Sequence, residues 1–401
     1  MIIAVVIVAI IAGAFGYQLM TATSTTTAMM TSATSVPLAS MTTAVMMSSS
    51  STTMTSASQP SQPVALLGAG ATFPAPLIQT WTAQYNKLHP TVTINYNGIG
   101  SGGGIQQITA KTVDFGASDA PLTDSQLANA TGLVLMPETL GGVAITYNLA
   151  TYGIPNSTVL HFTSDVIAGI YMGTITRWND PAIQALNPAA SLPNVPITAV
   201  HRSDGSGTTY AFTNYLSITN SNWANVVGYQ TSVTWPVDKL ANGIGASGNA
   251  GVAGAVFNTP GAIGYVDVIY ALSNHLGYGA VKNAAGNFVV PTLDTIRWAA
   301  QNATGNPSYT DLRMHIVNAA GGQSYPIATY TYLLIYKDMS VQPSMNKAKA
   351  QALAQFLWWA IHDGQSYAPA LVYVPLPSNI VSADEQLIKS LNYQGTTLVT
   401  S

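Results

Sequence analysis

The sequence predicts an α/β fold, because segments with the period of strands alternate with segments with the period of helices along most of the chain. Two observations carry this prediction. Short runs of alternating apolar residues end in glycine-rich turns, and helix-like runs begin directly after those turns. In folds of this class ligands bind at the carboxyl ends of the strands, so the glycine turns are where a site is expected.

The composition is that of a globular protein with very few charges. Of the 401 residues, 48% are hydrophobic and 7% are charged, whereas about 25% are charged in ordinary globular proteins. The net charge of -3 and the absence of a basic run argue against nucleic acid as a partner. Without cysteine the chain has no disulfide, no thiolate metal site and no lipid-modified amino-terminal cysteine.

The first 20 residues are almost wholly apolar, which predicts a signal or transmembrane anchor. No Lys or Arg precedes the apolar run, so the positive flank of an export signal is missing. A cleaved signal and a retained anchor both fit. We favour the anchor, because no small-x-small cleavage site is followed directly by a folded domain. Residues 21–63 are a Ser/Thr-rich tract without a period, which predicts a disordered, flexible stalk.

The folded part begins near Val64. The segment GAGATFPAP (68–76) leads into a run with one apolar helical face. We expect Thr72 at the amino-terminal cap of this helix, with Pro74 in its first turn. Thr72 and Phe73 would then offer a hydroxyl and a free amide to a ligand.

The next two predicted strands also end in polar turns. One strand ends in GIGSGGG (98–104), which contains Ser101 and leads into a short helix. The following strand, VDFGAS, stops at Asp119. After it, Thr123 and Gln126 have the spacing of a capping box, which predicts another helix start.

The most specific pattern is the segment HRSDGSGTT, which lies between an alternating apolar run and a helix-like run. Ser206, Gly207 and Thr208 would place hydroxyls and amides at a helix start, where the dipole is positive and an anion is attracted. Arg202 adds a planar fork of five donors, and Asp204 is close enough to hold that fork in one orientation. In a chain so poor in charge, this pair favours an oxyanion site over a simple capped helix.

A dinucleotide site fits the sequence less well. Gly98, Gly100 and Gly103 match GxGxxG after a strand, and Asp119 follows at a tolerable distance. However, Ser101 lies inside the loop, and a dinucleotide domain does not require the second anion loop far downstream. The lysine of a P-loop is absent as well, which argues against nucleotide hydrolysis.

A serine hydrolase is the other enzyme class considered, since His201 is near Ser206 and Asp204 in sequence. Neither serine loop has the GxSxG spacing of a nucleophile elbow, and we expect His201 on the far face of its strand, partly buried or at the surface. The six histidines show no metal-ligand spacing. No catalytic residue, metal or cofactor is therefore expected.

Taken together, GAGATFPAP, GIGSGGG with DFGASDAP, and RSDGSGTT resemble the PstS family, the periplasmic phosphate-binding proteins of the phosphate ABC importer. The similarity runs from about Leu67 to at least Pro377 and includes GGVAITYN, IYMGTITRWND and PGAIGYVD.

The resemblance implies a two-lobed periplasmic-binding-protein clamshell with two crossover hinge strands. On this sequence it assigns residues 64–147 and 328–401 to lobe I, and residues 148–327 to lobe II. The membrane anchor at 1–20 and the linker at 21–63 would precede the lobes.

The resemblance also implies capture of inorganic phosphate and its delivery to the permease subunits of an ABC transporter, without catalysis. The residues it assigns to phosphate are Thr72, Phe73, Ser101, Asp119, Arg202, Ser206, Gly207 and Thr208, with Asp204 supporting the arginine. The expected location is the extracytoplasmic cell surface, with the chain tethered to the membrane by its amino-terminal segment. A surface phosphatase and a receptor for another protonated oxyanion, such as arsenate, remain alternatives.

In this scheme Asp119 would provide selectivity. A carboxylate repels a fully ionised guest but accepts a hydrogen bond from one that still carries a proton, as phosphate does and sulfate does not near neutral pH. Micromolar capture requires about -8 kcal/mol, and one hydrogen bond to a charged group contributes about 1.5 to 3 kcal/mol. Donors from one loop are therefore too few, and both lobes must close on the anion.

Overall fold

A computed structural model describes residues 62–303 and 308–399 of the chain. The expected anchor at 1–20, and the expected linker up to residue 61, lie outside the described residues. Among the described helices, none combines the length and the apolar character that crossing a bilayer requires.

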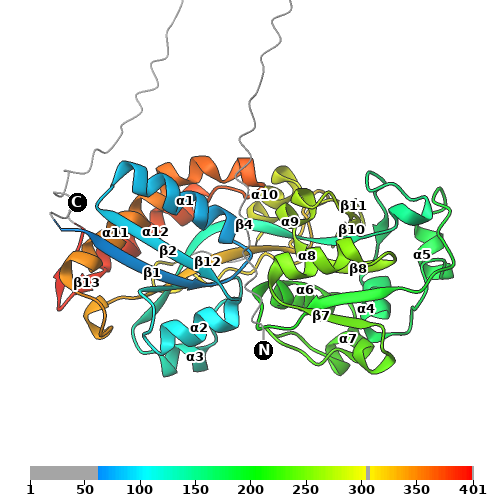
Figure 1. The fold of residues 1–401 in the computed structure, drawn as a ribbon, viewed down its shortest axis with the longest axis horizontal. Helices are drawn as coiled ribbons and strands as arrows, with labels where there is room; N and C mark the ends of the chain where they lie inside the picture. The colour runs from blue at the N-terminus through cyan, green and yellow to red at the C-terminus, as the bar shows by residue number, and fades with distance from the viewer. Residues whose placement is uncertain (1–61, 304–307, 400–401) are drawn as a thin grey trace, which may run out of the picture. The chain divides into compact units, whose positions relative to one another are not determined.

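Strands and helices alternate as the sequence predicts (Figure 1). Within the described residues, the main sheet has nine strands. They are β1 (Val64–Gly70), β2 (Val92–Gly98), β3 (Phe115–Ser118), β4 (Leu133–Tyr147), β6 (Thr198–Arg202), β7 (Gly243–Ala246), β8 (Ala262–Asp267), β9 (Gly277–Tyr278) and β12 (Ala328–Tyr336). Their spatial order is β2-β1-β3-β12-β4-β8-β6-β7, with β9 beside β4.

Two groups of parallel strands occupy the two ends of this order. The first strand group is β1 with its parallel neighbours β2 and β3, and the second is β6 with its parallel neighbours β7 and β8. The antiparallel strands β12 and β4 lie between the groups. β4, a strand of 15 residues, pairs with β12 up to Gly142 and with β8 from Val143 onward. Because β12 pairs with β3, β4 and β12 together join the two groups.

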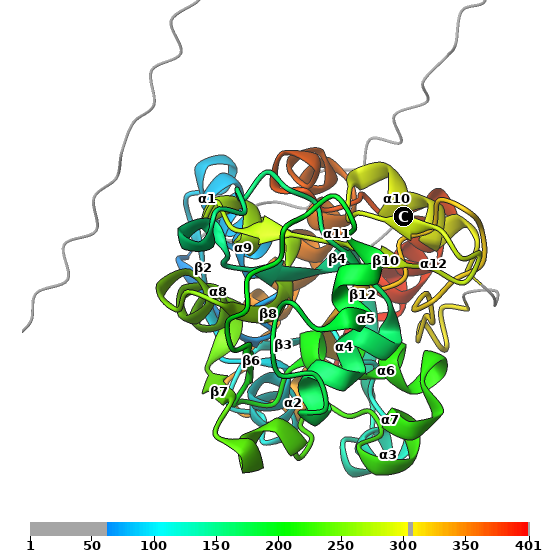
Figure 2. The same ribbon diagram turned by 90° about the vertical axis from the view of Figure 1, so that its right-hand side faces the viewer.

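Helices pack on both strand groups (Figures 1 and 2). They are α1 (Ala75–Leu88), α2 (Ser101–Thr109), α3 (Asp124–Asn129), α4 (Ser164–Met172), α5 (Pro181–Leu186), α6 (Gly207–Thr219), α7 (Ser221–Val226), α8 (Gly248–Asn258), α9 (Val268–Ser273), α10 (Leu293–Gln301), α11 (Lys347–Ile361) and α12 (Ser378–Ser390). α1 and α2 contact the first strand group, and α8 contacts all three strands of the second. Small strands add a sheet of β5 (His161–Phe162), β10 (Ala280–Lys282) and β11 (Phe288–Val289), and a pair of β13 (Asn392–Tyr393) and β14 (Thr396–Thr397).

Aromatic side chains form much of the core beside each strand group. In the second group the rings of Phe212 and Tyr265 stack 4.2 Å apart, and Trp235 lies 5.9 Å from Tyr265. Beside the first group, Tyr85 contacts Phe356 edge-on at 5.3 Å. Burying a side chain of this size stabilises a fold by about 1.5 to 3 kcal/mol. This packing holds the strands whose ends carry the polar loops.

The predicted strand, loop and helix around Arg202 are confirmed. β6 ends at Arg202 and α6 begins at Gly207. Ser206 caps α6, since its hydroxyl accepts a hydrogen bond from the Thr209 amide at 3.1 Å. The expected helix start with hydroxyls and amides therefore exists as a local structure.

Of two other predicted caps, one is present. Thr123 and Gln126 form the capping box of α3, as predicted. The expectation that Thr72 caps α1 is wrong: Pro74 occupies the cap position, without a side-chain cap. The Thr72 hydroxyl instead accepts a hydrogen bond from the Asn249 amide, a donor 177 residues away in the sequence.

Candidate functional site

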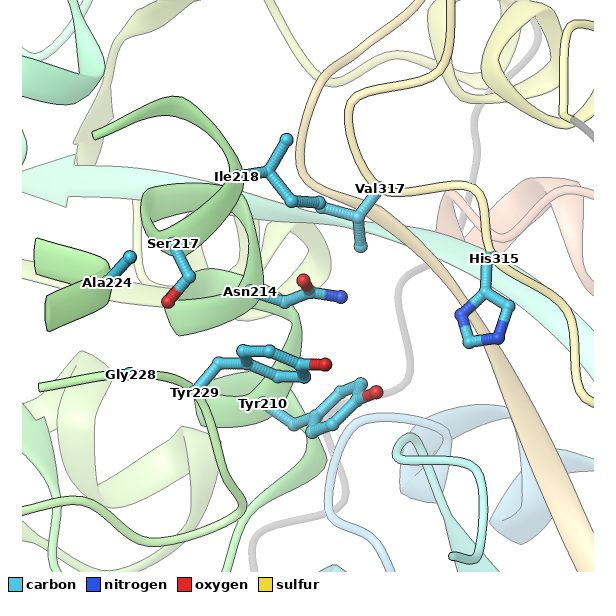
Figure 3. A pocket seen from close by; sticks show the side chains of 9 residues that line it. All are labelled: Tyr210, Asn214, Ser217, Ile218, Ala224, Gly228, Tyr229, His315 and Val317. Carbon is cyan, nitrogen blue, oxygen red and sulfur yellow. The ribbon is translucent and has the colours of Figure 1, made fainter. Parts of the chain in front are cut away.

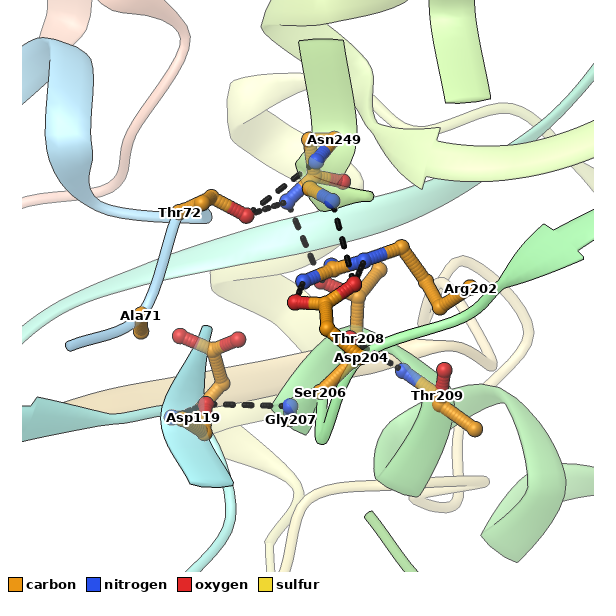
Figure 4. A network of polar contacts seen from close by, with 12 residues as sticks. Ala71, Thr72, Asp119, Arg202, Asp204, Ser206, Gly207, Thr208, Thr209 and Asn249 are labelled. Carbon is orange, nitrogen blue, oxygen red and sulfur yellow. Dashed lines mark hydrogen bonds and ion pairs between the residues drawn. The ribbon is translucent and has the colours of Figure 1, made fainter. Parts of the chain in front are cut away.

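The loops after the first strand group contact the loops after the second. The Gly207 amide donates to Ser101 Oγ at 3.0 Å. Asn249 donates to the Thr72 hydroxyl from its backbone and side-chain nitrogens, at 3.1 and 3.0 Å. Figure 4 shows the bonds from Asn249 to Thr72, two residues that come from opposite strand groups. Segments far apart in the sequence thus meet in one place.

The guanidinium of Arg202 is fixed by Asp204. The Arg202 side chain is only 1% exposed. Its Nε donates to Asp204 Oδ1 at 2.7 Å, and its Nη2 pairs with Oδ2. A bidentate pair of this kind sets the plane of the guanidinium. The remaining nitrogen, Nη1, lies 3.5 Å from the Thr208 hydroxyl.

Asp204 keeps its negative charge in this pair. Burial alone would raise the pKa of Asp204, but the hydrogen bonds and the charge of Arg202 outweigh burial, so the pKa lies below its ordinary value. The Gly248 amide also donates to Asp204 Oδ1, at 3.0 Å. The carboxylate therefore serves the guanidinium and one helix start, and is not free for a guest.

Asp119, directly after β3, is in the opposite situation. It is 1% exposed, and within the described part of the chain its Oδ1 has no hydrogen-bond partner. Burial raises the pKa of Asp119 to about 7, although the charge of Arg202 and the hydroxyls of Thr331 and Ser101 act to lower it. A buried oxygen without a partner is costly unless something pairs with it. Asp119 can therefore accept a hydrogen bond from a guest when ionised, or donate one when protonated.

Two helices begin beside each other at this point, α2 at Ser101 and α6 at Gly207. Gly100, before α2, has a φ of +85°, a left-handed conformation that favours glycine. A Cβ at Gly207 would overlap Asp119, so only glycine lets α6 approach the end of β3. Since the Ser101 hydroxyl bonds to the Gly207 amide, the positive ends of both helices lie side by side, and this favours an anion there.

Phe73 is anchored through its backbone and its ring. The side chain is fully buried, and the Tyr373 hydroxyl donates to Phe73 O at 2.6 Å. Tyr270 donates in the same way to Thr72 O, at 2.6 Å. These bonds fix the loop after β1. All nine predicted residues lie in the strand ends, loops and helix starts that meet here: Thr72, Phe73, Ser101, Asp119, Arg202, Asp204, Ser206, Gly207 and Thr208.

Asn249 belongs to the same network and was missed from the sequence. Its side-chain nitrogen lies 3.0 Å from the Thr72 hydroxyl and 3.2 Å from that of Thr208, and its Oδ1 accepts from the Asp267 amide at 3.0 Å. The signal was present: ASGNAG repeats the strand, glycine and helix-start pattern after β7. Arg202 was noticed because charged residues are rare in this chain, and Asn249 carries no charge.

Two further buried carboxyls lie close to Asp119. Burial raises the pKa of Glu138 to about 8; the Thr331 hydroxyl opposes this rise and the charge of Asp119 adds to it. Burial also raises the pKa of Asp267 well above its ordinary value. In the described residues Glu138 Oε2 and Asp267 Oδ2 have no hydrogen-bond partner. No group of three or more His, Cys, Asp or Glu in the described ranges is arranged to hold a metal ion.

The dinucleotide alternative does not fit this geometry. A Cβ at Gly100 would overlap Asp204 Oδ2. The Gly102 amide donates to Gly205 O at 2.8 Å. The glycine-rich loop therefore packs against the opposite loop, where a pyrophosphate would need space.

The serine hydrolase alternative also fails on geometry. His201 is buried, more than the sequence suggested, and stacks on Trp235 at 4.8 Å. Its Nε2 lies 2.8 Å from Asp238 Oδ1. The Ser206 hydroxyl accepts from the Thr209 amide. The proposed base and nucleophile thus have these partners and do not form a pair.

A separate cavity of about 550 Å³ lies beside α6. Figure 3 shows Tyr210, Tyr229 and His315 among its lining residues. The two tyrosine rings meet edge-on at 5.5 Å. None of the residues predicted to hold an anion lines this cavity, so it is distinct from the network around Arg202.

The fold and the gathered loops define a member of the PBP superfamily, whose domain model matches residues 57–363. A phosphate-binding protein PstS from Xylella fastidiosa is 42% identical over 329 residues, which cover 82% of this chain and 86% of the relative. The phosphate-binding protein PstS from Pasteurella multocida is 40% identical over 323 residues, 80% of this chain and 89% of the relative.

Among solved structures, a phosphate-binding protein from Stenotrophomonas maltophilia matches with a TM-score of 0.58 and 21% identity, covering 80% of this chain and 92% of that one. This likeness shows the α/β periplasmic-binding-protein-like fold. The identity with the curated relatives shows more: the chain belongs to the PstS family.

Proposed function

We propose that this protein is an extracytoplasmic solute-binding protein that captures inorganic phosphate and delivers it to the permease subunits of an ABC transporter. One observation carries the proposal. A guanidinium fixed by its own carboxylate and a buried carboxylate with an unused oxygen lie in loops from opposite strand groups. A cation with free donors and a lone acceptor match a tetrahedral oxyanion that still carries a proton. Membership of the PstS family supports phosphate as that anion.

The proposed ligand contacts come from both strand groups. Arg202 would donate from Nη1, and Asp119 would accept the ligand's proton. Hydroxyls and amides would supply the remaining hydrogen bonds. These groups belong to Thr72, Phe73, Ser101, Ser206, Gly207 and Thr208, with Asp204 supporting Arg202. Some of them now bond to each other, so binding requires ligand contacts to replace bonds such as that from Gly207 to Ser101.

The two strand groups would belong to two lobes that close on the anion. We assign residues 64–147 and 328–401 to lobe I and residues 148–327 to lobe II, with β4 and β12 as crossover hinge strands. β4 pairs with β8 of the second group and with β12, which in turn pairs with β3 of the first group, and this position supports a hinge role. The anchor at 1–20 and the stalk at 21–63 would tether the receptor to the outer face of the membrane.

The function requires binding and release, and no reaction on the ligand. This separates it from the surface phosphatase considered at the sequence level. Arsenate has the same shape and also carries a proton, so it is the anion from which phosphate is hardest to distinguish at this site.

Calorimetric titration of the purified full chain tests the proposal. Phosphate should bind at micromolar concentration or more tightly, while sulfate should give no heat of binding in the same range. A parallel titration with arsenate measures the ratio of the affinities for phosphate and arsenate, two oxyanions that both carry a proton. A simple aryl phosphate ester should not be hydrolysed. Turnover of the ester, or sulfate binding equal to phosphate binding, would contradict the proposal.

A further inference from the structure

Glu138 lies on a bulge in β4, the strand that joins the two strand groups. Thr331 of β12 pairs with Thr139 and the next residue, Tyr332, pairs with Pro137, so Glu138 is an extra residue in β4. Pro137 has no amide hydrogen to donate to the sheet, which is why such a residue is found at a bulge in a central strand. A bulge turns a side chain away from the alternation of its strand.

The side chain of Glu138 is held at one oxygen and unpartnered at the other. It is 1% exposed. Oε1 lies 2.9 Å from the Thr331 hydroxyl, while Oε2 has no hydrogen-bond partner within the described ranges. The backbone there is fixed as well, because Gln365 Nε2 donates to Glu138 O at 3.0 Å. A buried carboxyl in this position costs stability, and nothing in phosphate binding as proposed above uses it.

The Thr331 hydroxyl interacts with two carboxyls. It contacts Glu138, and it also acts as a hydrogen-bonding partner that lowers the pKa of Asp119. A hydroxyl has one proton to donate and two lone pairs that accept. It cannot donate to two carboxylates at once. It can donate to Asp119 while it accepts from Glu138, provided that Glu138 carries a proton.

Other charged and titratable groups surround this pair. Arg202 faces Asp119 from β6 and favours its ionised form. Asp267, at the end of β8, interacts with Asp119 through its charge. The charges of Glu138 or Asp119 also act on three tyrosines, Tyr96, Tyr270 and Tyr373. Burial raises the pKa of each of these tyrosines, so they remain neutral when the carboxyls titrate.

We propose that Glu138 is a positioning residue for Asp119. The protonated Glu138 donates to the Thr331 hydroxyl, which then points its own proton toward Asp119. Glu138 and Asp119 together then carry one negative charge, and that charge is on the Asp119 carboxylate that faces the ligand. This inference rests on the proposed function, since it concerns the same phosphate site.

The order of ionisation agrees with this role. Burial raises the pKa of both carboxyls, but the charge of Arg202 opposes this rise only at Asp119. Asp119 therefore loses its proton first, and its charge then favours the protonated form of Glu138. Two coupled acids of this kind titrate in two steps that belong to the pair. Once Glu138 ionises too, both carboxylates compete for one hydroxyl proton, and a second negative charge lies near the anion. Phosphate binding should then weaken.

The test is the pH dependence of phosphate affinity in the full chain, with wild type and Glu138→Gln compared by calorimetry. Between about pH 8 and pH 10 phosphate stays mostly HPO₄²⁻, so its own titration changes the affinity little. Wild-type affinity should fall about tenfold over this range, because binding favours the protonated form of a group that ionises there. Glu138→Gln is always neutral and should lose less than about twofold.

Asp384→Asn is the matched control. Asp384 on α12 is also buried, and both of its carboxylate oxygens lack partners in the described residues. Its charge acts on Tyr330. Tyr330 and Thr331 are neighbours on β12, so their side chains point to opposite faces. Asp384→Asn should therefore keep the wild-type fall in affinity. Equal falls in wild type and Glu138→Gln would overturn the proposal, as would a flat profile in Asp384→Asn.

A second measurement uses only the wild type, so it tests the proposal even if Glu138→Gln does not fold. Titrations at about pH 9 in buffers of different ionisation enthalpy count the protons exchanged on binding. The anion favours protonated Glu138, so wild type should take up part of a proton. No uptake would overturn the proposal while leaving phosphate binding intact. If wild type binds no phosphate at any pH, the proposed function itself fails.

Discussion

Asp119 from the first strand group and Asp204 from the second group lie in opposite environments. Asp204, from the second group, is paired bidentately with Arg202, and this pairing holds its pKa below the ordinary value despite burial. Asp119, from the first group, has an oxygen without a partner among the described residues, and burial raises its pKa to about 7. The Asp204 carboxylate is thus paired within the protein, whereas the Asp119 carboxylate has an oxygen that a ligand can contact.

The difference explains how a chain with 7% charged residues can hold an anion selectively. Asp204 neutralises Arg202, so the pair adds direction and donors without a large net charge. Helix starts and hydroxyls supply the remaining attraction. In the proposed function, Asp119 would then accept a hydrogen bond only from a guest that carries a proton. Each of the following variants changes either Asp119 or the pair of Arg202 and Asp204, or a contact between the two strand groups.

The largest effect should come from Arg202→Ala. In the proposed site Arg202 supplies the guanidinium that donates to the ligand, and loss of one partner of a buried, hydrogen-bonded charge pair costs about 2 to 5 kcal/mol of binding free energy. Phosphate affinity should therefore fall by at least about 100-fold, beyond detection by calorimetry. Arg297→Ala is the control, since Arg297 is 48% exposed and its ion pair with Asp294 is at the surface. If Arg202→Ala still bound phosphate tightly, Arg202 would not be a ligand-binding residue.

Asp119→Asn should change selectivity. An amide can donate a hydrogen bond to an anion that has no proton, so sulfate should compete with phosphate about 100-fold better than in wild type. Competition titrations at pH 8 measure the ratio. Asp124→Asn, whose side chain is 89% exposed, should leave the ratio unchanged. If sulfate competes no better in Asp119→Asn than in wild type, Asp119 does not distinguish anions that carry a proton from anions that do not.

The same role predicts a pH effect in the wild type. The pKa of Asp119 is raised to about 7, so the carboxylate form prevails above this pH and the protonated form below it. A protonated Asp119 can donate to sulfate. Discrimination against sulfate should therefore be strong above about pH 7 and decline as the pH falls through 7. In Asp119→Asn, competition titrations should show no such trend, and a wild-type ratio that is constant from pH 5 to pH 8 would contradict the assignment.

Asp204→Asn should have a smaller effect, about tenfold on phosphate affinity. The amide keeps the shape but supplies one acceptor and no charge, so Arg202 is oriented less firmly. The pair also contributes to folding. Because the pKa of Asp204 is lowered in the folded state, this contribution is present above its ordinary pKa and is lost as the pH falls through the lowered value. Thermal unfolding at pH 7 should show wild type more stable than Asp204→Asn, with the gap closing in acid. Equal stability at pH 7 would indicate that the pair contributes nothing to folding.

The smallest effect should come from Thr72→Val, which removes the hydroxyl that bonds to Asn249 across the two groups. One hydrogen bond contributes about 0.5 to 1.5 kcal/mol, so affinity should fall about three- to tenfold. Thr80→Val, in which the lost hydroxyl bonds only to Pro76 O on the same helix, is the matched control. Equal losses in both variants would point to a general packing effect and not to the site.

Local patterns predicted the local structures well. The strand, loop and helix around Arg202 follow from an alternating run, two glycines and a Ser at the cap, all within one short segment. The α3 capping box also depends only on residues three apart. Thr72 was misassigned as a cap for the opposite reason: its true partner, Asn249, is 177 residues away, and no local pattern reveals it.

The parts that could not be predicted depend on pairing between strands. Pro137 is compatible with a bulge in a central strand, but it does not show which strand lies opposite or in which register, so the contact of Glu138 with Thr331 could not be foreseen. The order of the sheet is non-local in the same way. The resemblance to the PstS family supplied the convergence of the loops, which spacing alone did not.

The most direct measurement is a crystal structure of the full chain grown with phosphate. The account predicts density for one tetrahedral anion between Ser101 and Ser206, with an oxygen within hydrogen-bond distance of Asp119 and another near Arg202 Nη1. Density for phosphate only elsewhere, or an anion that touches the loops of one strand group alone, would contradict it.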